Sequence, residues 1–312
     1  MNLYGKKVGK NMSAKVIKKN SIHRTKAEKI FTVFNYAFFA FLSLLVLYPF
    51  WHVMMVSVSS TEAALKGGLF LYPKGFNLDT YKSVFKSPDI YNGFYTTIVV
   101  AVSGTVLGTL LTAMTAYPLS KKRLRGGKVI MFLILFTMIF NAGMIPNYLL
   151  IKNLKLYDTR WALILPLMVS AYNCIIMKSF FAAIPESLEE SARIDGANDL
   201  KIFFYIIIPL SKATIATIAL FTAVTYWNDY MSTVLYIQNT AKWSLQAVLR
   251  NMLTNTQQAM QSAGVNVRAQ INTNAETIKA ASIVVATVPI LIVYPFVQKY
   301  FVKGVMIGGI KG

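Results

Sequence analysis

The stretch IPESLEESARIDGANDLKIFFYIIIPLSKA, residues 184–213, predicts two short helices joined by a sharp turn. Ser187 is followed three residues later by Glu190, a capping box that predicts the start of the first helix. Gly196 permits the positive φ of a tight turn, and the second helix is expected to begin at Asp199. Five of the chain's twelve acidic residues lie in this stretch, so we expect a stiff, charged protrusion that another protein can contact.

Long uncharged runs on both sides of this stretch predict a membrane protein. Of the 312 residues, 55% are hydrophobic and only 14% are charged, whereas soluble domains have about 25% charged residues. About 20 apolar residues cross a bilayer as a helix. Such runs occupy residues 30–61, 90–120, 129–151, 161–177, 202–228 and 280–298. The sequence therefore predicts an all-α membrane protein with six transmembrane helices.

The distribution of basic residues predicts the orientation of these helices. With six spans both ends of the chain lie on one side, and that side receives 21 of the 32 Lys and Arg residues. The densest cluster is KKRLR at residues 121–125, in a short loop. The positive-inside rule then places both termini in the cytoplasm. The expected parts are a basic tail (1–29), a transmembrane domain (30–298) with an external loop at 239–275, and a cytoplasmic C-terminal tail (299–312).

The scarcity of reactive side chains excludes several classes of function. Cys174 is the single cysteine, so neither an intrachain disulfide nor a cysteine-based zinc site is possible. His23 and His52 are the only histidines and form no ligand cluster, so no metal site and no catalytic residue is expected. The net charge of +20 would suggest nucleic acid in a soluble protein. Here the charges lie between neutral stretches, which indicates contact with the lipid bilayer and not with nucleic acid.

The 184–213 stretch also carries a motif with regular spacing. Glu190-Ser191-Ala192 is followed after three residues by Gly196, and nine residues later by Ile206-Ile207-Ile208-Pro209. This pattern resembles the EAA loop (Glu-Ala-Ala, three residues, Gly, nine residues, Ile-x-Leu-Pro) of permeases from ATP-binding-cassette (ABC) importers. Ser191 replaces an alanine of that pattern and Ile208 a leucine.

Three further segments resemble the carbohydrate-uptake branch of these permeases. They are ARIDGA at 192–197, WND at 227–229 and QKYFVKG at 298–304. The last is similar to permeases of the oligosaccharide and aldouronate group, of the type of the maltose permease's smaller subunit. The resemblance extends from about Thr32 to the C-terminus.

The resemblance implies a type I importer fold in the bacterial cytoplasmic membrane. The chain would form half of a heterodimeric pore with a second permease, above two ATPase subunits and below an extracytoplasmic sugar-binding protein. The substrate would be an oligosaccharide or a polysaccharide fragment. By the same resemblance, the residues that dock into the ATPase would be Glu190, Ser191, Ala192, Arg193, Asp195, Gly196 and Ala197.

No nucleotide site is expected in this chain. The segment GKKVGKN at residues 5–11 has its glycines one residue too close for a phosphate-binding loop, and Asn11 stands where Ser or Thr is needed. The chain is therefore predicted to bind no cofactor itself and not to be an enzyme. ATP and Mg²⁺ would be bound by the partner ATPase.

Polar and aromatic residues within the spans are candidates for the substrate path. Sugars offer hydroxyl groups for hydrogen bonds and apolar ring faces for stacking, and an ionisable residue in a span suggests a function. Alternatives remain open, since Asp229 can instead cap a helix break, and Asn141 and Asn173 can bond neighbouring helices. The candidates are Tyr226, Trp227, Asn228, Asp229, Asn141 and Asn173.

Two other functional classes are possible for a chain of this composition. A secondary transporter driven by an ion gradient predicts an inverted repeat or several buried charges, but no clear repeat is visible and only Lys212 and Asp229 are associated with the fifth span. A membrane-embedded enzyme needs a polar catalytic pair, and neither histidine nor Cys174 has an evident partner.

Overall fold

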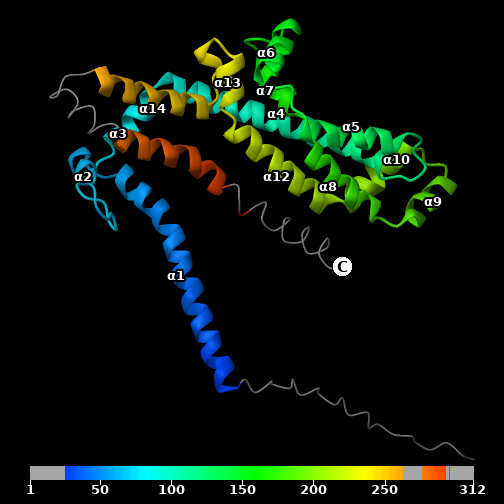
Figure 1. The fold of residues 1–312 in the computed structure, drawn as a ribbon, viewed down its shortest axis with the longest axis horizontal. Coiled ribbons are helices and arrows are strands. Elements are labelled where there is room, and N and C mark those ends of the chain that lie inside the picture. The colour runs from blue at the N-terminus through cyan, green and yellow to red at the C-terminus, as the bar shows by residue number, and fades with distance from the viewer. Residues whose placement is uncertain (1–24, 263–275, 293–294, 296–312) are drawn as a thin grey trace, which may run out of the picture. The chain divides into compact units, whose positions relative to one another are not determined.

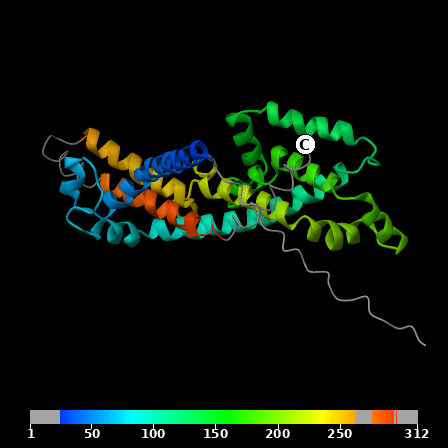
Figure 2. The same cartoon turned by 90° about the horizontal axis from the view of Figure 1, so that it is seen from below.

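The computed structural model describes residues 25–262, 276–292 and 295, and within these ranges the chain is helical and contains no strand. The chain divides into two compact units, with the boundary between Phe50 and Trp51. In the second unit α4 (Pro88–Leu119) extends along the whole body, with α3 (Asp79–Lys86) and α14 (Leu245–Ser262) at one end and α9 (Glu186–Ile194) at the other (Figures 1 and 2).

Helix α1 (Lys26–Ser57) begins with a capping box. The Thr25 hydroxyl accepts from the backbone N–H of Glu28 (3.2 Å), and the Glu28 carboxylate accepts from the N–H of Thr25 (2.9 Å). The most apolar 18-residue window of this helix has no buried residue within the chain. A helix satisfies its own backbone hydrogen bonds, so an exposed apolar helix of this length is suited to lipid.

Helix α4 is the centre of the second unit and packs against α8 (Ala171–Ala182), α12 (Lys212–Asn228) and α14. Two glycines permit close approach. A Cβ at Gly104 would lie 2.4 Å from the ring of Tyr226, and one at Gly108 would lie 2.5 Å from the carbonyl oxygen of Met168. Small residues at such crossings let membrane helices pack at short distance.

Three of the predicted spans are bent. The breaks have local causes: Asn141 Oδ1 accepts from the N–H of Gly143 (2.9 Å), which has φ +91°, and Ser170 caps α8. The bent pairs are α5 (Gly127–Ile139) with α6 (Met144–Asn153) at 115°, α7 (Trp161–Ile164) and η1 (Leu165–Leu167) with α8 at 52°, and the helices from Asp199 to Leu210 with α12 at 84°.

Among the described residues, α1 and α4 are each long and apolar enough to cross a membrane alone, and counting each bent pair as one span gives up to five. The sixth predicted span, 280–298, is described only in part, as a helix over residues 276–292. The predicted cytoplasmic tails lie outside the described residues, except for 25–29 at the start of α1.

The connections between the long helices contain further short helices. The segment between α1 and α4 contains α2 (Thr61–Lys66) and α3. The stretch between α12 and the last helix contains α13 (Met231–Tyr236), η3 (Thr240–Lys242) and α14. Of the predicted loop 239–275, residues 263–275 lie outside the described part of the chain.

The close approach at Gly104 gives a stability prediction. We expect Gly104→Val to lower the free energy of unfolding by about 1–3 kcal/mol or more, because the added side chain collides with Tyr226. Thermal unfolding in detergent measures the change. Val102→Leu, at a side chain that is 59% exposed on the same helix, is the control and should leave the melting temperature nearly unchanged. Equal shifts for the two variants would contradict tight packing at Gly104.

Candidate functional site

The 184–213 stretch forms the predicted helix, turn and second helix. The backbone N–H groups of Gly196 and Ala197 donate to the carbonyls of Arg193 (3.0 Å) and Ala192 (2.9 Å), and Gly196 has φ +78°. This confirms the glycine turn, because such hydrogen bonds close a helix C-terminus with a residue in the left-handed conformation.

The predicted capping box at Ser187 is wrong. Helix α9 begins one residue earlier, at Glu186, and Pro185 occupies the position before it without a side-chain cap. Ser187 therefore lies inside the first turn, where its carbonyl accepts a hydrogen bond from the hydroxyl of Ser191 (2.9 Å). Proline has its φ fixed near the helical value, so it can lead directly into a helix.

The second helix changes its winding before it turns into α12. It consists of α10 (Asp199–Ile202), a π-helical turn η2 (Phe203–Ile207) and α11 (Ile208–Leu210). Asn198 caps its start by accepting from the N–H of Lys201 (2.8 Å). The π turn ends two residues before Pro209, which has no N–H to donate to an α-helical bond.

Helix α9 has an exposed face and a buried face. Ile194 is 87% exposed although it is apolar, while Glu189 is only 2% exposed although it is charged. Ala192 and Ala197 pack against the buried apolar core of the protein. The exposed face follows the helical spacing of three and four residues, at Ser187, Glu190, Ser191 and Ile194.

The predicted docking residues therefore divide into two groups. Glu190, Ser191, Asp195 and Gly196 are exposed, whereas Ala192, Arg193 and Ala197 are partly buried against the chain itself. Ile194 was not among the predicted docking residues, although it lies on the same exposed face. Its spacing of four residues from Glu190 and three from Ser191 on a short amphipathic helix could have indicated this position.

A second residue that the sequence analysis missed is Glu189, whose carboxylate has three partners. It accepts from Lys121 Nζ, from Arg193 NH2 (3.3 Å) and from the Tyr117 hydroxyl (3.4 Å). The Lys121 side chain is itself only 9% exposed. A buried carboxylate is tolerated only when it is paired and hydrogen-bonded, which is the case here.

Asp199 extends this charge network at the surface. Its carboxylate accepts from Arg123 (2.6 Å) and from Arg193 (3.2 Å). The hydrogen bond from Arg123 is the main cause of the lowered pKa of Asp199, with Arg193 adding to it. Because the pKa is lower in the folded protein, this carboxylate contributes stability at neutral pH that is lost as the pH falls through the folded pKa.

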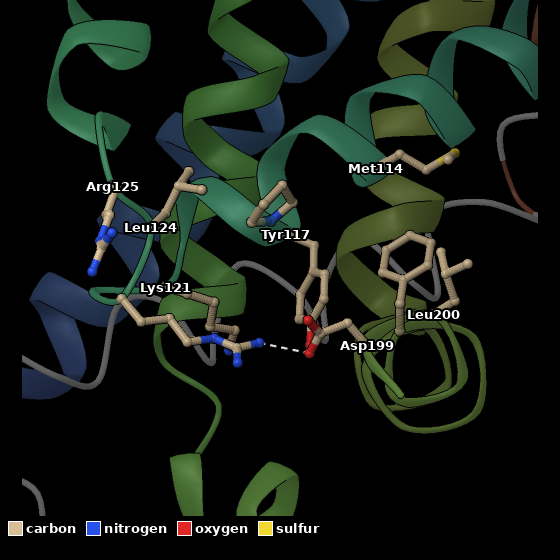
Figure 3. Close-up of a pocket in the computed structure, with 10 residues that line it drawn as sticks. Met114, Tyr117, Lys121, Leu124, Arg125, Asp199 and Leu200 are labelled. Carbon is tan, nitrogen blue, oxygen red and sulfur yellow. Dashed lines mark hydrogen bonds and ion pairs between the residues drawn. The ribbon is translucent and has the colours of Figure 1, made fainter. Parts of the chain in front are cut away.

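A pocket of about 440 Å³ opens beside this network. In Figure 3, Met114 and Leu200 lie at one end of the view, Leu124 and Arg125 at the other, and Tyr117 and Asp199 between them. The residues that line the pocket come from the end of α4, the loop that follows it and the start of the second helix of the protrusion. These segments are therefore in contact although more than 70 residues separate them along the chain.

A polar cavity of about 490 Å³ lies at the break between η1 and α8, beside α12. Asn173 is 8% exposed, and its amide donates to the Thr222 hydroxyl of the neighbouring helix (3.4 Å). Asn173 thus lines the cavity and also forms the helix–helix hydrogen bond considered as its alternative role. The cavity also has apolar walls; its polar and aromatic lining is Ser170, Tyr172, Asn173, Phe221, Thr222 and Thr225.

The aromatic candidates of span five are used in packing. Tyr226 is 2% exposed, and its hydroxyl donates to the carbonyl of Ile164 (2.6 Å). Trp227 donates from Nε1 to the carbonyl of Ala286 (3.1 Å) and so joins α12 to the last described helix. Neither residue lines the polar cavity.

The remaining candidates lie at helix ends. Asp229 Oδ1 accepts from the N–H of Ser232 (3.2 Å), which is the capping role considered as its alternative. Asn228 donates to the carbonyl of Val224 (3.0 Å), and Asn141 lies in the turn between α5 and α6. Of the predicted path residues, the structure thus brings Asn173 alone into the cavity.

These features define a class: a multi-pass helical membrane protein with a rigid, exposed protrusion formed from two short helices. The chain belongs to the family described as "Binding-protein-dependent transport system inner membrane component", whose model matches residues 104–307. The matched segment contains the protrusion and the polar cavity. The chain is thus a membrane permease subunit of an ABC importer, as the sequence predicted. The alternative, a secondary transporter driven by an ion gradient, is not favoured.

Relatives of similar length match almost the whole chain. The "Polygalacturonan/rhamnogalacturonan transport system permease protein YtcP" of Bacillus subtilis is 45% identical, over 91% of this chain and 99% of the relative. "Protein LplC" of the same organism is 42% identical, over 94% and 99%. A solved chain of a bacterial ABC transporter involved in the import of the acidic polysaccharide alginate is 35% identical with a TM-score of 0.78, covering 89% of this chain and 99% of that one.

The ion pairs of Glu189 and those of Asp199 should differ in strength. We expect Glu189→Gln to lower the free energy of unfolding by about 3–5 kcal/mol, because it leaves the buried Lys121 without its counter-charge. Asp199→Asn, which breaks exposed pairs, should cost less than about 1 kcal/mol. Thermal unfolding of the detergent-solubilised protein compares the two. A cost for Asp199→Asn as large as that for Glu189→Gln would contradict the difference in burial.

Proposed function

We propose that this chain is one of two different permease subunits of an importer for oligosaccharides, with six transmembrane helices and both termini in the cytoplasm. The observation that carries the proposal is the exposed face of α9, presented on a protrusion that ion pairs hold against the end of α4. The bias of basic residues toward the side of residues 121–125 supports the cytoplasmic orientation of this protrusion.

The exposed face of α9 is the proposed contact with the ATPase. It combines the carboxylates of Glu190 and Asp195 with the apolar side chain of Ile194. A complementary cleft would therefore carry an apolar pocket for Ile194 and basic or hydrogen-bonding groups at its rim. Two ATPase subunits bind ATP and Mg²⁺ and hydrolyse the ATP, and this chain binds neither ATP nor Mg²⁺.

The contact between α9 and the ATPase transmits the conformational change of the ATPase to the transmembrane helices. Closure of the two ATPases on ATP moves α9, and the helices attached to it open the pore to the outside. Return of the ATPases to their open state closes it again. The short turn at Gly196 and the ion pairs on the buried face of α9 make the protrusion stiff enough to transmit such a movement.

The substrate is proposed to be an oligosaccharide that contains uronic acids. Support comes from the relatives named for polygalacturonan and rhamnogalacturonan and from the solved transporter for alginate. The polar cavity between α8 and α12 suits a passing sugar, because the Asn173 amide and the Thr222 and Thr225 hydroxyls can bond sugar hydroxyls while Tyr172 and Phe221 offer ring faces.

An extracytoplasmic sugar-binding protein is the proposed source of the substrate. Its contact would be the predicted external loop 239–275, of which α14 forms the described part. This helix is anchored to α4, since the N–H of Leu245 donates to the Thr97 hydroxyl (2.8 Å). A firmly held external helix offers a fixed platform for a docking protein.

The coupling role gives a first test of the proposed function. We expect Gly196→Trp to abolish both co-purification of the ATPase and sugar uptake, because the bulky side chain projects from the exposed turn into the docking cleft. Gly196→Ala is the matched control, since it introduces the strain of a positive φ without the bulk. Membrane vesicles and a tagged ATPase provide both measurements. Normal uptake by Gly196→Trp would refute docking at this turn.

The cavity gives a second test. We expect Asn173→Ala to raise the KM for uptake of a galacturonate oligosaccharide by about 2- to 10-fold, the effect of losing one hydrogen bond. Thr222→Val removes both the bond between the helices and a hydroxyl that lines the cavity, so it should raise KM as well. Asn228→Ala, outside the cavity, should not change KM. An unchanged KM for Asn173→Ala would exclude this residue from the path.

A further inference from the structure

The carboxylate of Glu189 lies on the face of α9 that is turned away from the proposed ATPase contact. Glu190, the next residue, is exposed, but Glu189 is 2% exposed and is enclosed by Lys121, Arg193 and Tyr117. A residue that is covered by its own chain cannot serve as a docking contact. Its place in the fold therefore calls for another explanation.

Aromatic rings form the floor below the Glu189–Lys121 ion pair. The Lys121 ammonium lies 5.2 Å from the centre of the Tyr117 ring. That ring contacts Phe203 of the second helix (5.4 Å between centroids) and Phe181 at the end of α8 (6.4 Å). The rings exclude water from one side of the pair, which strengthens the attraction between the two charges.

Lys121 is fixed to the end of α4. Helix α4 ends at Leu119, and two hydrogen bonds hold the next residues to it: the N–H of Ser120 donates to the carbonyl of Ala116 (3.0 Å), and the N–H of Lys121 donates to the carbonyl of Pro118 (3.0 Å). Helix α4 in turn packs against α8, α12 and α14. A force on Lys121 is therefore applied to the helix that contacts most of the membrane domain.

Within the chain, α9 is also held by Pro185 before it, by the Gly196 turn after it, by the packing of Ala192 against the core, and by the hydrogen bond from the Tyr117 hydroxyl to Glu189. The Glu189–Lys121 pair joins α9 directly to the segment at the end of α4, and it opposes rotation of α9 relative to that helix.

We propose that the Glu189–Lys121 ion pair is the link that transmits displacement of α9 to α4, with Glu189 acting as a positioning residue. The inference rests on the proposed function and names how its coupling loop is attached. The burial of the pair suits this task, because separating two buried charges is far more costly than separating exposed ones. The surface pair of Arg123 and Asp199 can yield to water under the same load.

The test uses the whole importer, reconstituted in proteoliposomes with its second permease, ATPase and binding protein. Three quantities are measured: ATPase co-purification, ATP hydrolysis, and sugar transported per ATP hydrolysed. For Glu189→Gln we expect the ATPase to remain bound and active, while sugar transported per ATP falls at least tenfold. Asp199→Asn should keep the wild-type ratio.

A chemical replacement of the link covers the case in which Glu189→Gln does not fold. In the Glu189→Cys/Lys121→Cys variant, a short bifunctional thiol reagent joins the two positions covalently. We expect low transport per ATP before the reaction and recovery after it, whereas variants with one of the two introduced cysteines, which like the wild type keep the buried Cys174, should not recover. Recovery is an outcome that a purely structural role of Glu189 would not produce.

Other results would overturn the inference. Loss of ATPase co-purification by folded Glu189→Gln would make Glu189 a docking residue, and an unchanged ratio of sugar to ATP in that variant would show that the pair carries no force. Absence of recovery in the cross-linked variant would have the same meaning. Failure of the wild-type chain to bind an ATPase would instead refute the proposed function, so the two failures are distinguishable.

Discussion

The close packing around α4 is the constraint on which the rest of the structure depends. Gly104 leaves room for the ring of Tyr226, and Gly108 lets the helix approach the Met168 carbonyl directly. In a bilayer, where lipid tails are as apolar as leucine, association of helices relies on such contacts and on interhelical hydrogen bonds. The bond from Tyr226 to the Ile164 carbonyl and the bond from Leu245 to Thr97 are examples of the second kind.

The charged side chains of the protrusion differ in their exposure to solvent. Glu189 and Lys121 are enclosed and paired, whereas Glu190 and Asp195 remain exposed to a partner. One short helix thus has a buried, paired glutamate on one side and exposed carboxylates on the other. Its two adjacent glutamates therefore lie in different environments.

The sequence predicted the helical membrane class, the glycine turn and the exposure of Glu190, because these depend on composition and on local spacing. It did not predict the breaks at Asn141–Gly143 and at Ser170, because a straight helix and a bent one can have the same run of apolar residues. It also could not separate Glu189 from Glu190. Only tertiary packing determines which of two neighbouring carboxylates is buried, and Lys121, its partner, is 68 residues away.

Helix α4 connects the bent helices to the charge network of the protrusion. The polar cavity lies at the break between η1 and α8, and α8, η1 and α12 all pack against α4. Any movement of α4 that starts at Lys121 therefore changes the walls of the cavity. By linkage, a sugar that binds one arrangement of those walls more tightly must favour the corresponding position of α9. In the proposed function, substrate and ATPase would then act on the same equilibrium through one helix, without direct contact between them.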